Sequence, residues 1–181
     1  IQEELKRGED DPGRMATQKL FETAYREHPY RLPIIGTKES IDSFRREDVL
    51  HFYRKHYVPS NMTVVLAGDF ELEEARAKVE SYFGDFQGPE HAFVNRTNES
   101  EQAGLRCAVS DDAGQDSHLR MAFHIPNATH DDIPALELLS TILGQGEASI
   151  LHQSVQREQE LVNMIYAAAY TLRDSGLFFV S

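Results

Sequence analysis

One stretch of the chain, residues 87–103, lacks the regular spacing of apolar residues found on both sides of it. It collects Gly, Pro, Asn, Thr, Ser and Glu, a composition typical of a connection between two hydrophobic cores. The sequence therefore predicts two folded segments, 1–86 and 104–181, joined by a linker at 87–103. The length of 181 residues fits either one large domain or one domain and a fraction of another. Because a sheet as small as that of the second segment would normally continue, we expect that segment to be incomplete.

Before the linker, apolar residues recur with helical spacing. Helices are predicted at residues 1–10, 14–27, 46–57 and 72–83. In the first helix Ile1, Glu4 and Leu5 share one face, which places a carboxylate on the apolar side of that helix. A β-branched, apolar run at 62–67 predicts a short strand buried on both faces, and Gly84 is placed to cap the last helix.

After the linker, apolar and polar residues alternate from Leu119 to Ile125. This alternation predicts a half-buried strand whose polar face, with His118 and His124, is open to solvent. The expected order continues with helices at 131–144 and 148–160 and with strands at 164–172 and 177–180, which flank a hairpin turn at Asp174-Ser175-Gly176.

Charge and hydropathy exclude two classes of partner. Eighteen basic and 30 acidic residues give a formal charge of −12, which repels a phosphate backbone, so no nucleic acid is expected to bind. No stretch reaches the roughly eighteen apolar residues of a membrane helix, so no membrane span is expected. Cys107 is the only cysteine, so a metal would need oxygen or imidazole ligands, and we expect Cys107 to be a small buried hydrophobic residue.

The histidines form no recognisable motif, and both H-E-x-x-H and H-x-x-E-H are absent. His51 and His56 are five residues apart, about 140° around a helix, which indicates one exposed and one packed histidine rather than two ligands. His118 and His124, six apart on the predicted strand, and His130 make only a weak metal candidate. A group of carboxylates is expected to form a solvated helix face: Glu71, Glu73, Glu74 and Glu80.

An ordered series of short motifs runs along most of the chain. It comprises Glu4-Leu5, Glu9-Asp10-Asp11-Pro12, His28-Pro29-Tyr30, Pro33, Gly36, Arg46-Glu47-Asp48, Phe52-Tyr53, Tyr57-Val58-Pro59, Asn61-Met62, Gly68-Asp69, Ile142-Leu143-Gly144, Gly146, Leu151 and Arg157-Glu158. This series resembles the pitrilysin, insulinase and mitochondrial-processing-peptidase family of zinc metallopeptidases. The resemblance implies an α+β fold of metallohydrolase-like domains, with mostly antiparallel sheets covered by helices.

The resemblance also implies the domain organisation of the chain and its binding partners. Residues 1–86 would be the C-terminal part of the zinc-binding domain, and 104–181 the N-terminal part of a second, homologous domain. In the family two such halves, fused or separate, enclose an unfolded peptide substrate. The expected partners are therefore a peptide and a second homologous half or subunit.

The resemblance assigns one role to a residue of this chain. Glu4 stands eight positions before Pro12, which is the place of the third zinc ligand in the family. The two histidine ligands and the general-base glutamate belong to an H-x-x-E-H motif, expected before Ile1. The implied function is peptide hydrolysis by zinc-activated water. With one ligand of three, this segment alone is expected to be inactive and not to retain Zn²⁺.

One departure from the family pattern concerns Arg157. Supporting halves of the family often carry tyrosine seven positions after such an arginine, whereas this chain has Met164. Arg157 is therefore given no catalytic role and is expected to be an exposed helix charge. The absence of the pair agrees with the assignment of Glu4.

Two other interpretations stay open at this point. The chain could come from a non-catalytic family member that acts as a scaffold or partner subunit, or it could be an unrelated acidic binding domain. An intact H-x-x-E-H in the parent sequence would favour the peptidase, and a degraded one would favour the scaffold. A fold without a helix-covered antiparallel sheet would favour the unrelated binding domain. The expected location is the bacterial cytoplasm or periplasm.

Overall fold

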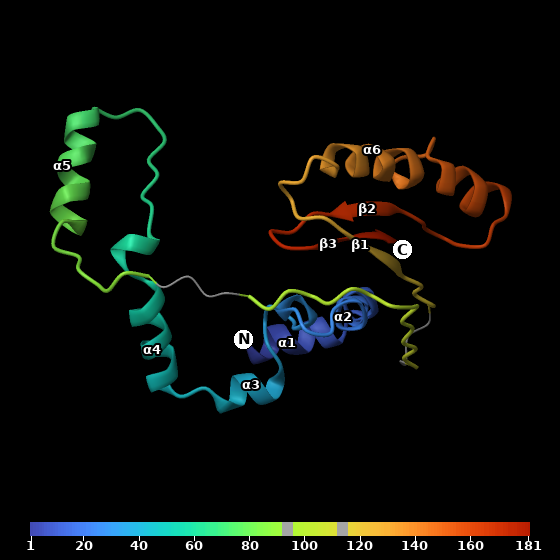
Figure 1. Ribbon diagram of the computed structural model, residues 1–181, viewed down its shortest axis with the longest axis horizontal. Coiled ribbons are helices and arrows are strands. Elements are labelled where there is room, and N and C mark those ends of the chain that lie inside the picture. Colours follow the sequence, from blue (N-terminus) through green and yellow to red (C-terminus); the bar gives the residue numbers. More distant parts are fainter. Residues whose placement is uncertain (92–95, 112–115) are drawn as a thin grey trace. The chain divides into compact units, whose positions relative to one another are not determined.

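The computed structural model describes residues 1–91, 96–111 and 116–181, which fall into two compact units (Figure 1). Unit 1 comprises Ile1–Lys38 and Arg96–Ser181, and unit 2 comprises Glu39–Asn95. Part of the predicted linker, 92–95, lies outside the described residues. The division into parts of two larger domains at 87–103 stays a prediction.

The helices and strands of unit 1 are α1 (Gln2–Glu9), α2 (Pro12–Ala24), the 3₁₀ turn η1 (Pro29–Arg31), β1 (Met121–Ile125), α6 (Ile133–Gly144), the π-helical η3 (His152–Glu158), β2 (Ala167–Tyr170) and β3 (Gly176–Val180). Unit 2 holds α4 (Arg46–His56), the 3₁₀ turn η2 (Pro59–Asn61) and α5 (Leu72–Phe83), and α3 (Lys38–Ser43) spans the boundary. The predicted helices at 46–57 and 72–83 are confirmed almost to the residue.

Unit 1 is built on an antiparallel sheet with strand order β1-β3-β2. β2 and β3 form the predicted hairpin, and β3 also pairs with β1. Paired residues on neighbouring strands, such as Phe123 and Phe178, point to the same face of the sheet, and side chains along each strand alternate between the two faces. On one face Ile125, Ala167 and Phe178 form the buried core, with α6 packed over it (Figure 1).

The other face of the sheet meets α2, which contradicts the expectation that the polar side of β1 is open to solvent. His124 Nε2 lies 3.0 Å from the Ala24 carbonyl oxygen, and its ring contacts Tyr25 edge-on. Phe123, on the opposite side of β1, is exposed. The reason is that β1 is an edge strand and α6 packs mainly over β2. On the apolar side of β1 only Ile125 is buried, whereas Ala122 and His124 on the polar side are both half-buried.

Short polar contacts fix the ends of the helices. α2 begins at Pro12, and the side chain of Asp11 accepts a hydrogen bond from the Arg14 amide at 3.1 Å, which satisfies a donor that the helix leaves unpaired. In unit 2, the side chain of Asp48 accepts from the Arg45 amide at 2.9 Å at the start of α4. Both helices thus begin where a carboxylate can satisfy a backbone amide.

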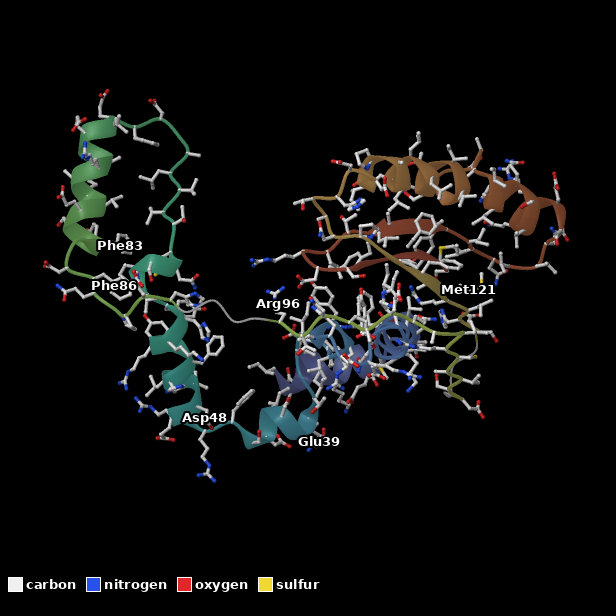
Figure 2. The ribbon with its side chains drawn as sticks, in the orientation of Figure 1. Glu39, Asp48, Phe83, Phe86, Arg96 and Met121 are labelled. Carbon is white, nitrogen blue, oxygen red and sulfur yellow. The ribbon has the colours of Figure 1, made fainter. Side chains whose placement is uncertain are left out.

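Unit 2 corrects the prediction of a strand at 62–67. These residues form no strand, and Met62, Val64, Val65 and Leu66 are exposed. A β-branched run becomes a strand only beside a partner strand that accepts its hydrogen bonds, and the described part of unit 2 provides none. Apolar side chains on α4 and α5 are exposed as well, Phe83 among them (Figure 2).

The predicted fold class is confirmed: helices combine with a small antiparallel sheet, and helices lie on both faces of it. Among the helices of the described residues, none combines the length and the apolar character needed to cross a bilayer.

Candidate functional site

Glu4, the predicted zinc ligand, lies in the first turn of α1 and is exposed. Its carboxylate favours the positive end of the helix dipole and has no hydrogen-bond or ion-pair partner among the described residues. Ile1, on the same face, is also exposed, whereas Leu5 is half-buried. This face of α1 is free to meet another group, but exposure is common for glutamate, so the assignment stays a prediction.

The residues present do not make a zinc site by themselves. A catalytic zinc needs three protein ligands, and the described parts of the chain contain no group of three His, Cys, Asp or Glu side chains that could hold a metal ion. The candidate of His118, His124 and His130 fails for the same reason. Glu4 could supply at most one ligand to a site completed by other residues.

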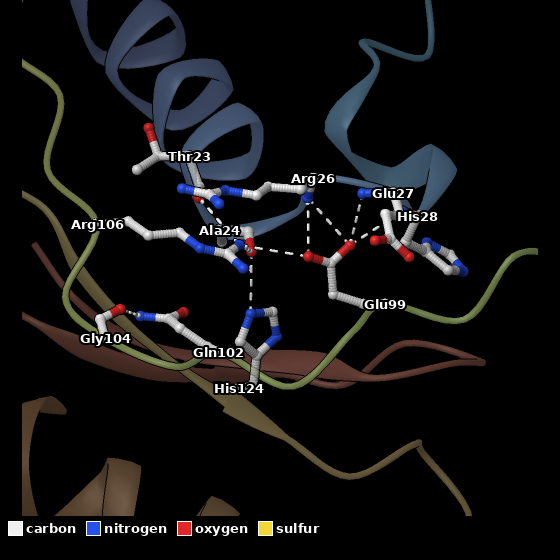
Figure 3. A network of polar contacts seen from close by, with 10 residues as sticks. All are labelled: Thr23, Ala24, Arg26, Glu27, His28, Glu99, Gln102, Gly104, Arg106 and His124. Atoms are coloured by element: carbon white, nitrogen blue, oxygen red, sulfur yellow. Dashed lines mark hydrogen bonds and ion pairs between the residues drawn. The ribbon is translucent and has the colours of Figure 1, made fainter.

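Instead, the densest polar cluster surrounds Glu99 (Figure 3). Its carboxylate accepts hydrogen bonds from three successive backbone amides, those of Arg26, Glu27 and His28, at 2.8–3.0 Å. Arg106 adds an ion pair at 3.3 Å, and both side chains are largely buried. Glu99 therefore binds the chain just after α2 from a position more than 70 residues away in sequence.

The carboxylate of Glu99 is held in its charged form. Burial raises its pKa, but the hydrogen bonds from the amides of His28, Arg26 and Glu27 and from Arg106 outweigh burial and lower the pKa to about 2. A charged, buried carboxylate with four donors is what makes this contact specific.

Two side chains satisfy the carbonyl oxygens that α2 leaves unpaired at its end. Arg106 donates to the carbonyl oxygen of Ala24, and the His124 ring lies against the same oxygen (Figure 3). The last turn of α2 is thus joined both to β1 and to the segment that carries Glu99 and Arg106.

A second cluster surrounds Asp174, in the turn between β2 and β3. The Asp174 carboxylate accepts from Arg96 at 2.9 Å and lies 3.3 Å from Nε2 of the buried His28. The Tyr30 hydroxyl is 3.4 Å away. The hydrogen bond from Arg96 lowers the pKa of Asp174, against the effect of burial. Nδ1 of His28 accepts a hydrogen bond from the Tyr30 amide, whereas its buried Nε2 faces the Asp174 carboxylate without a hydrogen bond. The cluster thus joins the turn between β2 and β3 to the segment after α2.

The outcomes for the remaining predicted residues differ from one residue to the next. Arg157 is exposed, as expected, and pairs with Glu147 at 2.8 Å. Glu71, Glu73, Glu74 and Glu80 are exposed, as predicted. Cys107 is exposed, so the prediction that it is buried is wrong: its neighbour Arg106 turns inward to Glu99, and the thiol points away. His56 is packed as predicted, but its partner, His91, was not foreseen.

Comparison with known proteins identifies relatives along nearly the whole chain. The profile described as "Peptidase M16 inactive domain" matches residues 43–181. An uncharacterised zinc protease from Mycobacterium leprae is 26% identical, covering 99% of this chain and 41% of that protein. The zinc protease PqqE of Helicobacter pylori is 27% identical, covering 95% and 39%. The chain thus spans about two fifths of the length of these curated relatives.

Solved structures agree with this result. The crystal structure of a protease from Helicobacter pylori has a TM-score of 0.85 at 27% identity and covers 99% of this chain and 44% of that one. A peptidase M16 inactive domain from Pseudomonas fluorescens, 20% identical with a TM-score of 0.76 and coverage of 97% and 42%, shares the fold. The resemblance inferred from the ordered motifs is confirmed. Since the profile matches more than three quarters of the residues, the chain belongs to the family of peptidase M16 inactive domains.

Proposed function

We propose that this chain is a segment of a zinc metalloendopeptidase that cleaves unfolded peptides or small proteins, and that Glu4 is one zinc ligand of that enzyme. The observation that carries the proposal is the likeness, over 95–99% of the chain, to relatives named zinc proteases. When bound, zinc would polarise the scissile carbonyl and acidify a bound water. The other two ligands would come from residues outside this sequence.

In this proposal the two parts of the chain have different tasks. Residues 104–181, which lie within the match to the inactive domain, would help to enclose a substrate without reacting with it. Glu4 lies outside the matched residues, on α1, which packs against α2. Glu99, Arg106 and His124 bind the end of α2, so these contacts would set where Glu4 is held relative to the sheet.

A second candidate function is that of a non-catalytic half that pairs with an active partner. The description of the matched family as an inactive domain favours it. Both candidates assign residues 104–181 to a domain homologous to the zinc-binding one. They differ in Glu4, which has a ligand role only in the first.

The test is made in the full-length parent protein with Glu4→Gln, which removes a charged oxygen ligand at nearly constant size. We expect zinc content to fall from about one ion per chain to less than a tenth of that, with a similar loss of peptidase activity, because catalytic zinc sites depend on every protein ligand. Zinc is measured by elemental analysis and folding by circular dichroism.

The matched control is Glu3→Gln, since Glu3 is also exposed, lies in the same turn of α1, and points about 100° away. It should keep its zinc and activity. A Glu4→Gln protein with full zinc content would refute the ligand role. A parent that neither binds zinc nor cleaves unfolded peptides before any substitution would favour the non-catalytic half.

A further inference from the structure

Two histidines of unit 2 meet end to end. Nδ1 of His56, in α4, lies 3.0 Å from Nε2 of His91, 35 residues further along the chain. The ring centroids are 5.2 Å apart and the ring planes are tilted by 58°, so the rings approach nitrogen to nitrogen rather than stacking. One nitrogen must carry a proton and the other must accept it.

This pair is the ionisable part of a larger contact that holds residues 88–91 against the turn after α4. The amide of His91 donates to the Ser60 hydroxyl oxygen at 2.9 Å. The backbone at Gly88 approaches Val58 so closely that an added Cβ would lie 2.9 Å from its side chain, and Val58 is buried. The Ser60 hydroxyl in turn donates to the Pro89 carbonyl oxygen at 3.5 Å. Segment 88–91 is thus positioned by two hydrogen bonds to Ser60, one packing contact and the histidine pair.

The contact between the two rings survives the addition of one proton to the neutral pair but not of two. In the neutral pair one N–H donates to the other ring, and in the singly protonated pair the same bond becomes charge-assisted and stronger. When both rings are protonated, two N–H groups face each other and two positive charges lie at contact distance. The hydrogen bond is then lost and replaced by repulsion.

We propose that the His56–His91 contact is an acid-released latch that holds segment 88–91 on η2 at neutral pH and lets it go when both rings become protonated. The latch is a property of unit 2 and does not depend on the zinc role of Glu4. It would make the attachment of segment 88–91 to η2 sensitive to pH.

The surroundings of the pair favour the neutral form. Burial lowers the pKa of His56, and positive charge on His91, Lys55 and His51 lowers it further. η2 contributes Ser60 and Asn61, neither of which is ionisable, and the only carboxylate next to His91 in sequence is the exposed Glu90. A histidine with a lowered pKa stabilises the closed contact above its usual titration range near pH 6.5, and this stabilisation is lost as the pH falls through the lowered value.

Hydrogen exchange of the full chain tests the latch. The amide of His91 is followed at pH 7.5 and pH 4.5, with rates normalised to intrinsic exchange and amides inside α4 as an internal reference. We expect protection at His91 to fall at least fivefold at pH 4.5 while α4 changes less than twofold. His56→Gln keeps a side chain that can donate or accept but cannot titrate, so its protection should change less than twofold between the two pH values.

The matched control is His51→Gln, since His51 is exposed on the same helix, has no hydrogen-bond partner among the described residues and makes only the smallest contribution to the lowered pKa of His56. It should retain the fivefold change. Equal protection of the wild type at both pH values, or a pH dependence that survives in His56→Gln, would overturn the proposal. If His56→Gln does not fold, the ring nitrogens of the wild type are titrated by NMR: two coupled steps support the latch, and two independent single steps contradict it.

Discussion

Apolar residues recur with regular spacing in both units, but only in unit 1 are most of these apolar side chains covered by another layer of structure. In unit 1 the sheet is covered by α6 on one face and α2 on the other, and Leu177 and Phe178 are almost completely enclosed. In unit 2 the apolar residues of α4, of α5 and of 62–66 remain largely exposed (Figure 2). Periodicity therefore identifies a face that can be buried, and a complementary layer decides whether it is.

The largest effect expected from this difference comes from a matched pair of phenylalanine substitutions. Phe178→Ala should lower the free energy of unfolding by about 4 kcal/mol, because it opens a cavity among Ile125, Ala167 and Leu143. Phe44→Ala, at an exposed position of unit 2, should change it by less than about 0.5 kcal/mol. Urea denaturation followed by circular dichroism measures both, and similar losses would mean that unit 2 has a core of its own.

An intermediate effect is expected at the polar contacts of unit 1. Glu99→Gln should cost about 2 kcal/mol at pH 7, since it leaves Arg106 without its charged partner. The pKa of Glu99 is lowered from 4.5 to about 2, so its charge stabilises the fold above pH 4.5, and this contribution is lost as the pH falls towards 2.

The difference in stability between wild type and Glu99→Gln should therefore shrink steadily between pH 4.5 and pH 2. Denaturation at several pH values measures it. Glu101→Gln serves as the control, because Glu101 is exposed and has no partner among the described residues. A difference that stays constant across this range would show that the carboxylate charge does not contribute.

The smallest effect on stability is expected in the exposed run of unit 2. Val65→Lys should change the free energy of unfolding by less than about 0.5 kcal/mol, since Val65 is 81% exposed. It should nevertheless reduce binding of a hydrophobic fluorescent dye, because it places a charge among the exposed side chains of Val64 and Leu66. Val109→Lys, at an exposed position of unit 1, should reduce dye binding less, and an equal reduction would count against a distinct apolar surface on unit 2.

Local elements were predictable because their causes are local. The helix at 72–83 follows from the spacing of Leu72, Val79 and Phe83, and the hairpin follows from the turn residues before β3. The strand at 62–67 was predicted wrongly because strands depend on neighbours that the sequence of the run does not name.

The contacts between distant residues were not predictable from spacing. Glu99 meets the amides after α2 across more than 70 residues, and His56 meets His91 across 35. Neither pair belongs to a motif of fixed spacing, and each side chain alone reads as an ordinary surface residue. The family was recognisable from ordered motifs, whereas the zinc role proposed for Glu4 would require further ligands that the described part of the chain does not provide.

The turn between β2 and β3 carries a consequence for how the chain can vary. Hairpin turns ordinarily tolerate insertions, because they lie at the surface with few contacts. Here Asp174 is held by Arg96, and the Tyr25 hydroxyl donates to the Ser175 carbonyl oxygen at 2.6 Å. An insertion here would disturb contacts to two distant parts of unit 1, so the tertiary structure constrains the length of this loop.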